Sequence, residues 1–101
     1  MSTSLFYLRY IRTAVLTDLS IPQTQTVSVT YPPAHMYWKV SGDVQGTGTV
    51  MISHVLSNKV SGRFSTNGGG DYYDTNASVS FIPDGPARGK IKASLRFAQL
   101  P

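Results

Sequence analysis

Cysteine and glutamate are both absent from this sequence of 101 residues, and each absence excludes a class of protein. Without cysteine the chain has no disulfide framework, no thiol nucleophile and no thiolate metal site. The lack of glutamate removes one of the best helix formers, and all five acidic residues are aspartate, which favours turns. The composition therefore argues against a helical protein.

Charged residues are scarce, at 14% of the chain, compared with about a quarter in an average globular protein. Serine and threonine together number 22, so the polar surface is largely neutral. The formal net charge is +4 and the isoelectric point is about 9.6. A charge of this size fits an anionic partner, but it also fits the ordinary solubility of a small domain.

Long apolar runs and targeting signals are also missing. Arg9 and Arg12 interrupt the apolar N-terminal stretch, so it does not have the pattern of a signal peptide. No run approaches the roughly 18 apolar residues of a membrane-spanning helix. We expect a single domain over residues 1–101 with no membrane span. A virion or the cytoplasm is most compatible with these features, although the compartment itself stays open.

Alternation of apolar and polar residues is the main pattern that is present. From Gly89 onward, Ile91 and Leu95 belong to an apolar series that alternates with a cationic one, which predicts a half-buried strand. Comparable patterns predict strands within residues 5–16, 24–31, 36–41, 46–56, 60–66 and 77–82. Residues 1–16 are expected to form a strand or an arm involved in assembly.

Turn residues separate these segments. Pro32 and Pro33 end one strand, Gly42 and Asp43 open a turn or bulge, and residues 67–76 form a long loop. We therefore predict an all-β fold, an antiparallel β-sandwich of about seven strands that is Ig-like or jelly-roll-like, with a small barrel as the alternative. Trp38 is the expected core aromatic.

Catalytic constellations are not found in the sequence. Only His35 and His54 are of the residue type that acts as a general base near neutral pH, and the chain offers no cysteine or glutamate to partner them and no GxSxG motif. His35 is expected at a turn or on the surface, and His54 in a packed, hydrogen-bonded position. The GTGT segment at residues 46–49 is interpreted as a turn or bulge. We expect no enzyme, no cofactor and no metal site.

The loop at residues 67–76 combines three glycines with oxygen ligands and aromatic rings. Its tyrosines suit contact with a partner protein or a glycan. A Ca²⁺ site is the least favoured interpretation, and a hairpin loop whose Asp and Asn side chains cap turns is the alternative without a ligand. The candidate partner- or ligand-binding residues are Asp71, Tyr72, Tyr73, Asp74 and Asn76.

The final strand carries four of the nine cations of the chain within nine residues and no acid. Its single aromatic residue, Phe97, falls on the apolar face, whereas proteins that bind single-stranded nucleic acid interleave cations with exposed aromatics. We therefore favour protection of a sheet edge, or electrostatic contact with a protein, over nucleic acid. The residues of this electrostatic face are Arg88, Lys90, Lys92 and Arg96.

The N-terminal segment crowds large apolar and aromatic side chains onto both faces of a predicted strand. A one-sided sheet in a monomer buries about half of such a set, so the other half needs a partner. We expect this segment to lie between subunits. The candidate assembly residues are Leu5, Phe6, Tyr7, Leu8, Tyr10 and Ile11.

These observations predict a non-enzymatic structural or interaction module that acts through its surface. We expect it to be a subunit of a larger or symmetric assembly, for example a virion accessory or decoration protein, with a protein partner or itself as the partner. The first alternative is a carbohydrate-binding module that uses residues 67–76. The second is a nucleic-acid-binding domain that uses the basic C-terminal strand.

Overall fold

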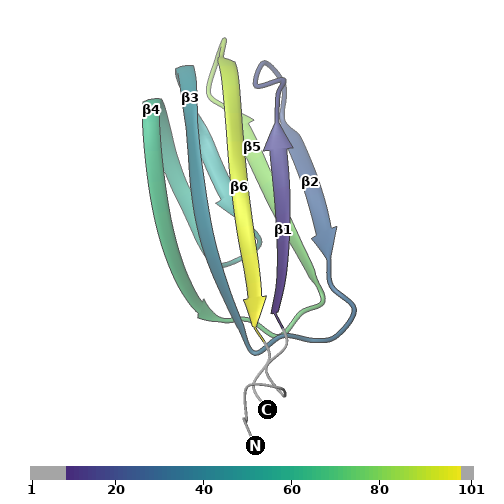
Figure 1. Ribbon diagram of the computed structural model, residues 1–101. Helices are drawn as coiled ribbons and strands as arrows, with labels where there is room; N and C mark the ends of the chain where they lie inside the picture. The colour runs from purple at the N-terminus through teal and green to yellow at the C-terminus, as the bar shows by residue number, and fades with distance from the viewer. Residues whose placement is uncertain (1–8, 99–101) are drawn as a thin grey trace, which may run out of the picture.

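The computed structural model describes residues 9–98, and all of the regular secondary structure in this range is β-strand (Figure 1). Over these residues no helix is long and apolar enough to cross a membrane. The strands are β1 (Arg9–Leu16), β2 (Gln23–Ser28), β3 (His35–Ile52), β4 (Leu56–Asp71), β5 (Asn76–Pro83) and β6 (Arg88–Ala98).

The six strands pair antiparallel in the order β1-β6-β3-β5-β2, and β4 pairs with the other side of β3. β3 is long enough to join two layers, because its first part pairs with β6 and its last five residues pair with β5. The sheet rolls until β1 and β2 lie side by side, which makes a nearly closed, barrel-like sheet (Figure 1). The prediction of an all-β antiparallel fold is therefore confirmed. The single, nearly closed sheet corresponds to the small barrel given as the alternative and not to the preferred β-sandwich, and it has six strands in place of about seven.

The seam between β1 and β2 is closed by side chains. Arg12 donates from Nε to the carbonyl oxygen of Ser28 at 3.0 Å, and the amide of Val15 donates to Oε1 of Gln25 at 3.0 Å. A regular ladder between β1 and β2 is not found among the described residues. In the strand order β1-β6-β3-β5-β2, the barrel therefore stays open between the two end strands, β1 and β2.

Gly42 and Asp43, which were expected to open a turn or bulge, lie within β3, so no turn forms there and a bulge follows them. The register shifts further along, between Val44 and Gly48. Gly46 lies in this bulge with φ of 105°, and a Cβ there would be 2.4 Å from the carbonyl oxygen of Pro86. The sequence pattern predicted two strands, within residues 36–41 and 46–56, whereas the structure has one strand, β3, that bends at this bulge. This difference accounts for the lower strand count.

The loop expected at residues 67–76 is also shorter than predicted. Residues 67–71 continue β4 and pair with β3, so only residues 72–75 connect β4 to β5. A Cβ on Gly68 would be 2.8 Å from the Trp38 ring, and a Cβ on Gly69 would be 2.5 Å from the Tyr37 ring. These glycines make room for aromatic rings that fold across the strand, and they do not form a turn.

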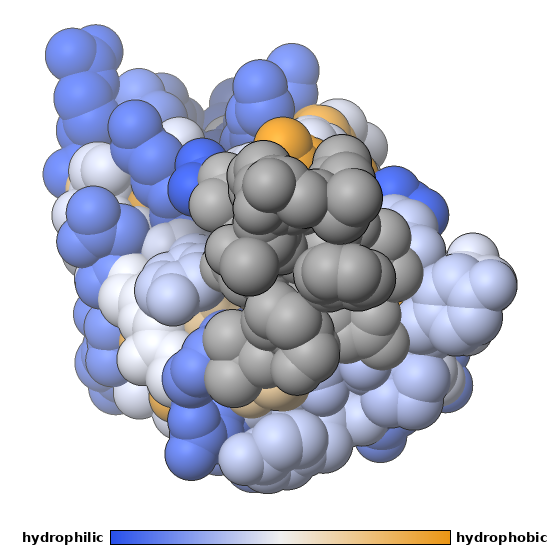
Figure 2. All heavy atoms as spheres, turned by 60° about the horizontal axis from the view of Figure 1, so that its bottom comes forward, coloured by the Kyte–Doolittle hydropathy of each residue, from blue (hydrophilic) through white to orange (hydrophobic). Residues whose placement is uncertain are grey.

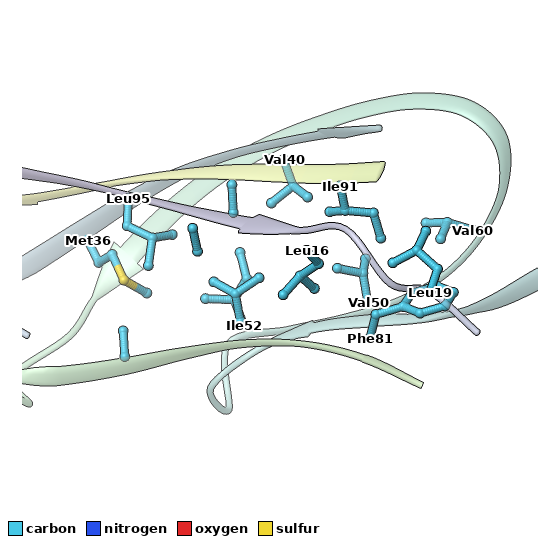
Figure 3. Close-up of a cluster of buried hydrophobic side chains, with 14 of the residues drawn as sticks. Leu16, Leu19, Met36, Val40, Val50, Ile52, Val60, Phe81, Ile91 and Leu95 are labelled. Atoms are coloured by element: carbon cyan, nitrogen blue, oxygen red, sulfur yellow. The ribbon is translucent and has the colours of Figure 1, made fainter. Parts of the chain in front are cut away.

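The core fills the space inside the rolled sheet, and Figure 3 shows its side chains converging from β3, β5, β6 and the end of β1. Phe81 and Phe97 are its largest fully buried side chains. The alternation predicted for the last strand is confirmed, because its four apolar residues are completely buried: Ile91, Ala93, Leu95 and Phe97. Trp38 packs against this core but is only partly buried.

Candidate functional site

One edge of β4 is the longest unpaired edge in the described part of the chain. β4 spans Leu56–Asp71 and pairs with β3 along one side only. No other strand within residues 9–98 covers its second side. An unpaired edge presents a row of backbone N–H and C=O groups that can pair with another strand.

The residues that face outward at this edge follow from the alternation of the antiparallel ladder. The amide of Val15 points away from β6, because it donates to Gln25. In an antiparallel sheet, the backbone N–H and C=O groups of successive residues point to opposite sides of the strand. Following the register from β1 through β6 and β3 to β4 shows that these groups of Ser65, Asn67 and Gly69 point to the open side of β4. The intervening residues of β4 bond to β3.

This edge has little protection over its second half. Natural edges are guarded by charged side chains, proline or short length. From Phe64 to Gly70 the strand has no charged residue and no proline, and Ser65 and residues 67–70 are exposed. Lys59 and Arg63 guard only the first half. The stretch from Phe64 to Gly70 is therefore open to pairing.

A cationic face lies on the outside of the layer formed by β1, β6, β3 and β4. Residues directly opposite in register share a face, so the outward residues of β6 lie in rows with those of β3 and β4. One row, for example, joins Lys90, Asp43 and Arg63. The cationic face contains six of the nine cations of the chain, all of them exposed: Lys39, Arg63, Arg88, Lys90, Lys92 and Arg96.

The final strand is not an edge. β6 pairs with β1 on one side and with β3 on the other, so the expectation that its cations guard a sheet edge is wrong. Within residues 9–98 the two ion pairs are His35 with Asp71 and Lys59 with Asp84, and neither involves the cationic face. Its positive charges are therefore left uncompensated by the fold.

Three shallow hollows follow one another along the line where β3 and β6 meet on this face. The first has a volume of about 460 Å³ and is lined by Tyr37, Lys39 and Arg96 among others. The next, of about 270 Å³, shares Lys39 and adds Lys92. The last, of about 240 Å³, lies between Asp43 and the Arg88–Lys90 segment. Each hollow is lined by two cations.

The two tyrosines of the predicted binding loop lie in different environments. Tyr73 is 67% exposed, whereas Tyr72 is 3% exposed and belongs to the core. The Tyr72 hydroxyl donates to the carbonyl oxygen of Asn76, so its contact with Ser53 Oγ at 3.0 Å requires the Ser53 hydroxyl to donate. Ser53 Oγ also accepts the amide of Ser78 at 3.0 Å. Tyr72 thus stabilises the barrel and is not open to a partner.

The other three candidate residues of this loop each have a separate protein partner. Asp71 pairs with His35 at 3.3 Å, Asp74 accepts the backbone amide of Asn76 at 2.9 Å, and the Asn76 side chain accepts from Ser28 at 2.7 Å. Among the described residues no group of three or more His, Cys, Asp or Glu is placed to hold a metal ion. Each of these three side chains therefore already has a partner within the protein.

The two histidines do not form a catalytic group. His35 lies at the start of β3, where it pairs with Asp71 and contacts the Tyr37 ring at a centroid distance of 6.2 Å. His54 is exposed and stacks on Tyr72, with ring centroids 5.7 Å apart. The expectation that His54 is packed holds only for one face of its ring.

The N-terminal candidates fall partly outside the described residues. Leu5, Phe6, Tyr7 and Leu8 precede the range that the structure describes, whereas Tyr10 and Ile11 lie in β1. Tyr10 packs against the core, and Ile11 is 60% exposed on the outer side. Figure 2 looks onto this pole, where the visible surface around the grey atoms is mostly hydrophilic or near neutral with small hydrophobic patches.

A further hollow of about 550 Å³ lies at the opposite pole, between residues 17–20 and residues 86–89. The Ser20 hydroxyl and amide donate to the Asp18 carboxylate there, which lowers the pKa of Asp18. These bonds form within a single turn, so they stabilise the turn and do not form a site.

No protein-family model matches this sequence, and no curated protein matches it. A solved structure of Bacillus endospore appendages, described as a novel family of disulfide-linked pili, matches it in three dimensions with a TM-score of 0.51. The match covers 93% of this chain and 89% of that chain at 16% sequence identity. At this identity the likeness concerns the fold alone. The chain therefore has the fold of a protein that forms pili.

Proposed function

We propose that this chain is a non-enzymatic structural subunit that associates with copies of itself into a fibre-like assembly. The single observation that carries the proposal is the unpaired edge of β4, which is open to a further strand from Phe64 to Gly70. The fold likeness to a pilus protein supports it. Addition of a strand to an open edge supplies backbone hydrogen bonds without a dedicated pocket.

Residues 5–8, the part of the predicted assembly segment that precedes β1, are the donor that we propose this edge receives from a neighbouring copy. Their large apolar side chains need a second surface. Tyr10 and Ile11 lie in β1 and pair with β6 of their own subunit. Donor and acceptor then lie on different parts of each subunit. A head-to-tail contact of this kind propagates along an axis when its rotation does not close into a ring, and we propose the open arrangement.

The assembly proposed here differs in chemistry from the disulfide-linked pili. This chain has no cysteine, so its subunits are held together by strand pairing and apolar burial alone. The virion and glycan hypotheses gain no support within residues 9–98. The glycan hypothesis in particular loses its pair of exposed tyrosines, because Tyr72 is in the core.

The test uses two variants, each altered on one side of the proposed contact. Ser65→Pro removes an outward-facing amide from the edge of β4, and Ser65→Ala is the matched control that keeps it. Deletion of residues 1–8 removes the donor and leaves all of β1 in place. Sedimentation velocity should give large particles for the wild type and for Ser65→Ala. Ser65→Pro should give monomers close to the 11.0 kDa of the full chain, and the truncated variant should give monomers that are smaller by eight residues.

Mixing the two altered variants gives the sharpest readout. The Ser65→Pro chain keeps its donor and the truncated chain keeps its acceptor, so together they should form one contact and stop at a heterodimer. Wild-type chains that remain monomeric at high concentration would refute the proposal. Large assemblies formed by Ser65→Pro alone would refute the role of the β4 edge.

A further inference from the structure

The cationic face defined above has no structural explanation in the fold. Five of its six cations do not guard an edge, because β6 and β3 both lie inside the sheet, and Arg63 on β4 is the exception. None of the six belongs to either ion pair formed within residues 9–98. Among the residues of β6 from Lys90 to Arg96 and the residues of β3 directly opposite them, Asp43 is the single acid. Like charges gathered on one face destabilise a domain unless an anionic partner offsets them.

The face also combines its cations with an exposed aromatic ring, which the final strand by itself lacks. Tyr37 of β3 lies directly opposite Arg96 of β6 and is 45% exposed. Its ring packs over Gly69, where a Cβ would be 2.5 Å from Cδ1, so a glycine backbone supports it from beneath. The ring lies beside His35 and keeps enough of its surface exposed to contact a base.

Neutral hydrogen-bonding groups lie between the cations. Ser94 and Asn67 line the first hollow with Tyr37, Lys39 and Arg96. A hydroxyl and an amide beside an aromatic ring can pair with the polar edges of a base or with a sugar. This hollow of about 460 Å³ therefore has both the stacking and the polar groups that one nucleotide needs.

We propose that the cationic face binds single-stranded nucleic acid, with the phosphates running along the line where β3 and β6 meet and a base stacked on Tyr37. The track runs from Arg88 to Arg96, eight residues along β6, or about 26 Å at roughly 3.3 Å per residue. Sites on small β-barrels hold about four or more nucleotides. The inference does not rest on the proposed assembly, although the hollow borders the β4 edge through Asn67.

Other occupants fit this face less well. The major groove of duplex DNA admits a helix or a two-stranded ribbon, whereas this face is the broad outer side of four paired strands. A second copy of the same face carries the same positive charge and is repelled. An acidic peptide would pair with the cations but would not need the Tyr37 ring.

The experiment measures fluorescence anisotropy of a labelled thymidine oligomer of about ten nucleotides with the full chain. Tyr37→Ala should weaken binding about tenfold, because base stacking is lost, whereas Tyr37→Phe should bind as the wild type does. Tyr73→Ala is the matched control, since it removes an exposed tyrosine away from the face. Polyglutamate is the competitor that lacks bases.

The charges are tested by the dependence of affinity on salt. If four to six phosphates are contacted, the slope of log K against log salt should be about −3 to −4. The double variant Lys92→Gln with Arg96→Gln should reduce this slope by about 1.4. Lys59→Gln, which removes a cation paired with Asp84 outside this face, should leave the slope unchanged.

Three outcomes would overturn the proposal. The first is the absence of binding at low salt. The second is equal binding of polyglutamate together with no effect of Tyr37→Ala, which would make the face a general polyanion surface. The third is a duplex bound as tightly as the single strand. Because the Ser65→Pro variant retains the whole cationic face, its binding can be measured whether or not the subunits assemble.

Discussion

Neighbouring tyrosines at positions 72 and 73 should respond to mutation in opposite ways. Tyr72 is 3% exposed and packs with Phe97 and His54, whereas Tyr73 is 67% exposed. Replacing a buried aromatic residue by alanine typically costs about 3–5 kcal/mol, while an exposed site changes stability by about 0.5 kcal/mol or less. Tyr72→Ala should therefore remove a large part of the stability of the domain, and Tyr73→Ala almost none.

Tyr72→Phe keeps the ring and isolates the hydroxyl. The change removes the bond to the Asn76 carbonyl and leaves the Ser53 hydroxyl without its acceptor. Two hydrogen bonds at about 0.5–1.5 kcal/mol each give a loss of about 1–3 kcal/mol. For a domain of this length, that corresponds to a melting temperature lower by roughly 5–20 °C.

The measurement is thermal and urea unfolding of the four single variants, Tyr72→Ala, Tyr72→Phe, Tyr73→Ala and Tyr73→Phe, followed by circular dichroism. The expected order of stability places both Tyr73 variants beside the wild type, Tyr72→Phe below them and Tyr72→Ala lowest. Equal effects at the two positions would refute the assignment of Tyr72 to the core. So would a Tyr72→Ala variant within 1 kcal/mol of the wild type.

Three further predictions concern the backbone, the seam and the chemistry of assembly. Gly89→Ala should lower stability by about 2–3 kcal/mol in urea unfolding, since φ is 132° and a Cβ would be 1.9 Å from the Asp43 carbonyl oxygen, whereas Gly70→Ala meets open space and should be nearly neutral. Gln25→Ala should cost about 0.5–1.5 kcal/mol by removing the acceptor of the Val15 amide, and Gln25→Glu, which keeps an acceptor, should cost less. Excess dithiothreitol should leave the sedimentation profile unchanged, because the chain has no cysteine, and a shift would contradict purely non-covalent assembly.

The half of the fold that depends on local alternation could be predicted from the sequence. The apolar residues of the final strand face inward as their period-two spacing indicates, because one side of each strand of this small barrel faces the core. The lack of helix followed from the composition. Neither inference required knowledge of which strands are neighbours.

Features that depend on pairing could not be predicted in this way. Gly68 and Gly69 were interpreted as turn residues, but their role is to make room for Trp38 and Tyr37, which lie opposite them only in the β3–β4 register. The cations of β6 suggested a sheet edge, but β6 pairs with β1 and β3, and the sequence pattern does not reveal these neighbours. Tyr37 was likewise separated from Arg96 by 59 positions in the sequence, although the two are partners across the sheet.

Amide hydrogen exchange along β4 is the most direct test of the central claim, that copies of this chain assemble through its open edge. The amides of Ser65, Asn67 and Gly69 face the open side, whereas those of Thr66 and Gly68 bond to β3. The account predicts that Thr66 and Gly68 are protected in both dilute and assembled protein. Ser65, Asn67 and Gly69 should exchange freely when dilute and become protected on assembly. Assembled particles in which those three amides still exchange freely would contradict it.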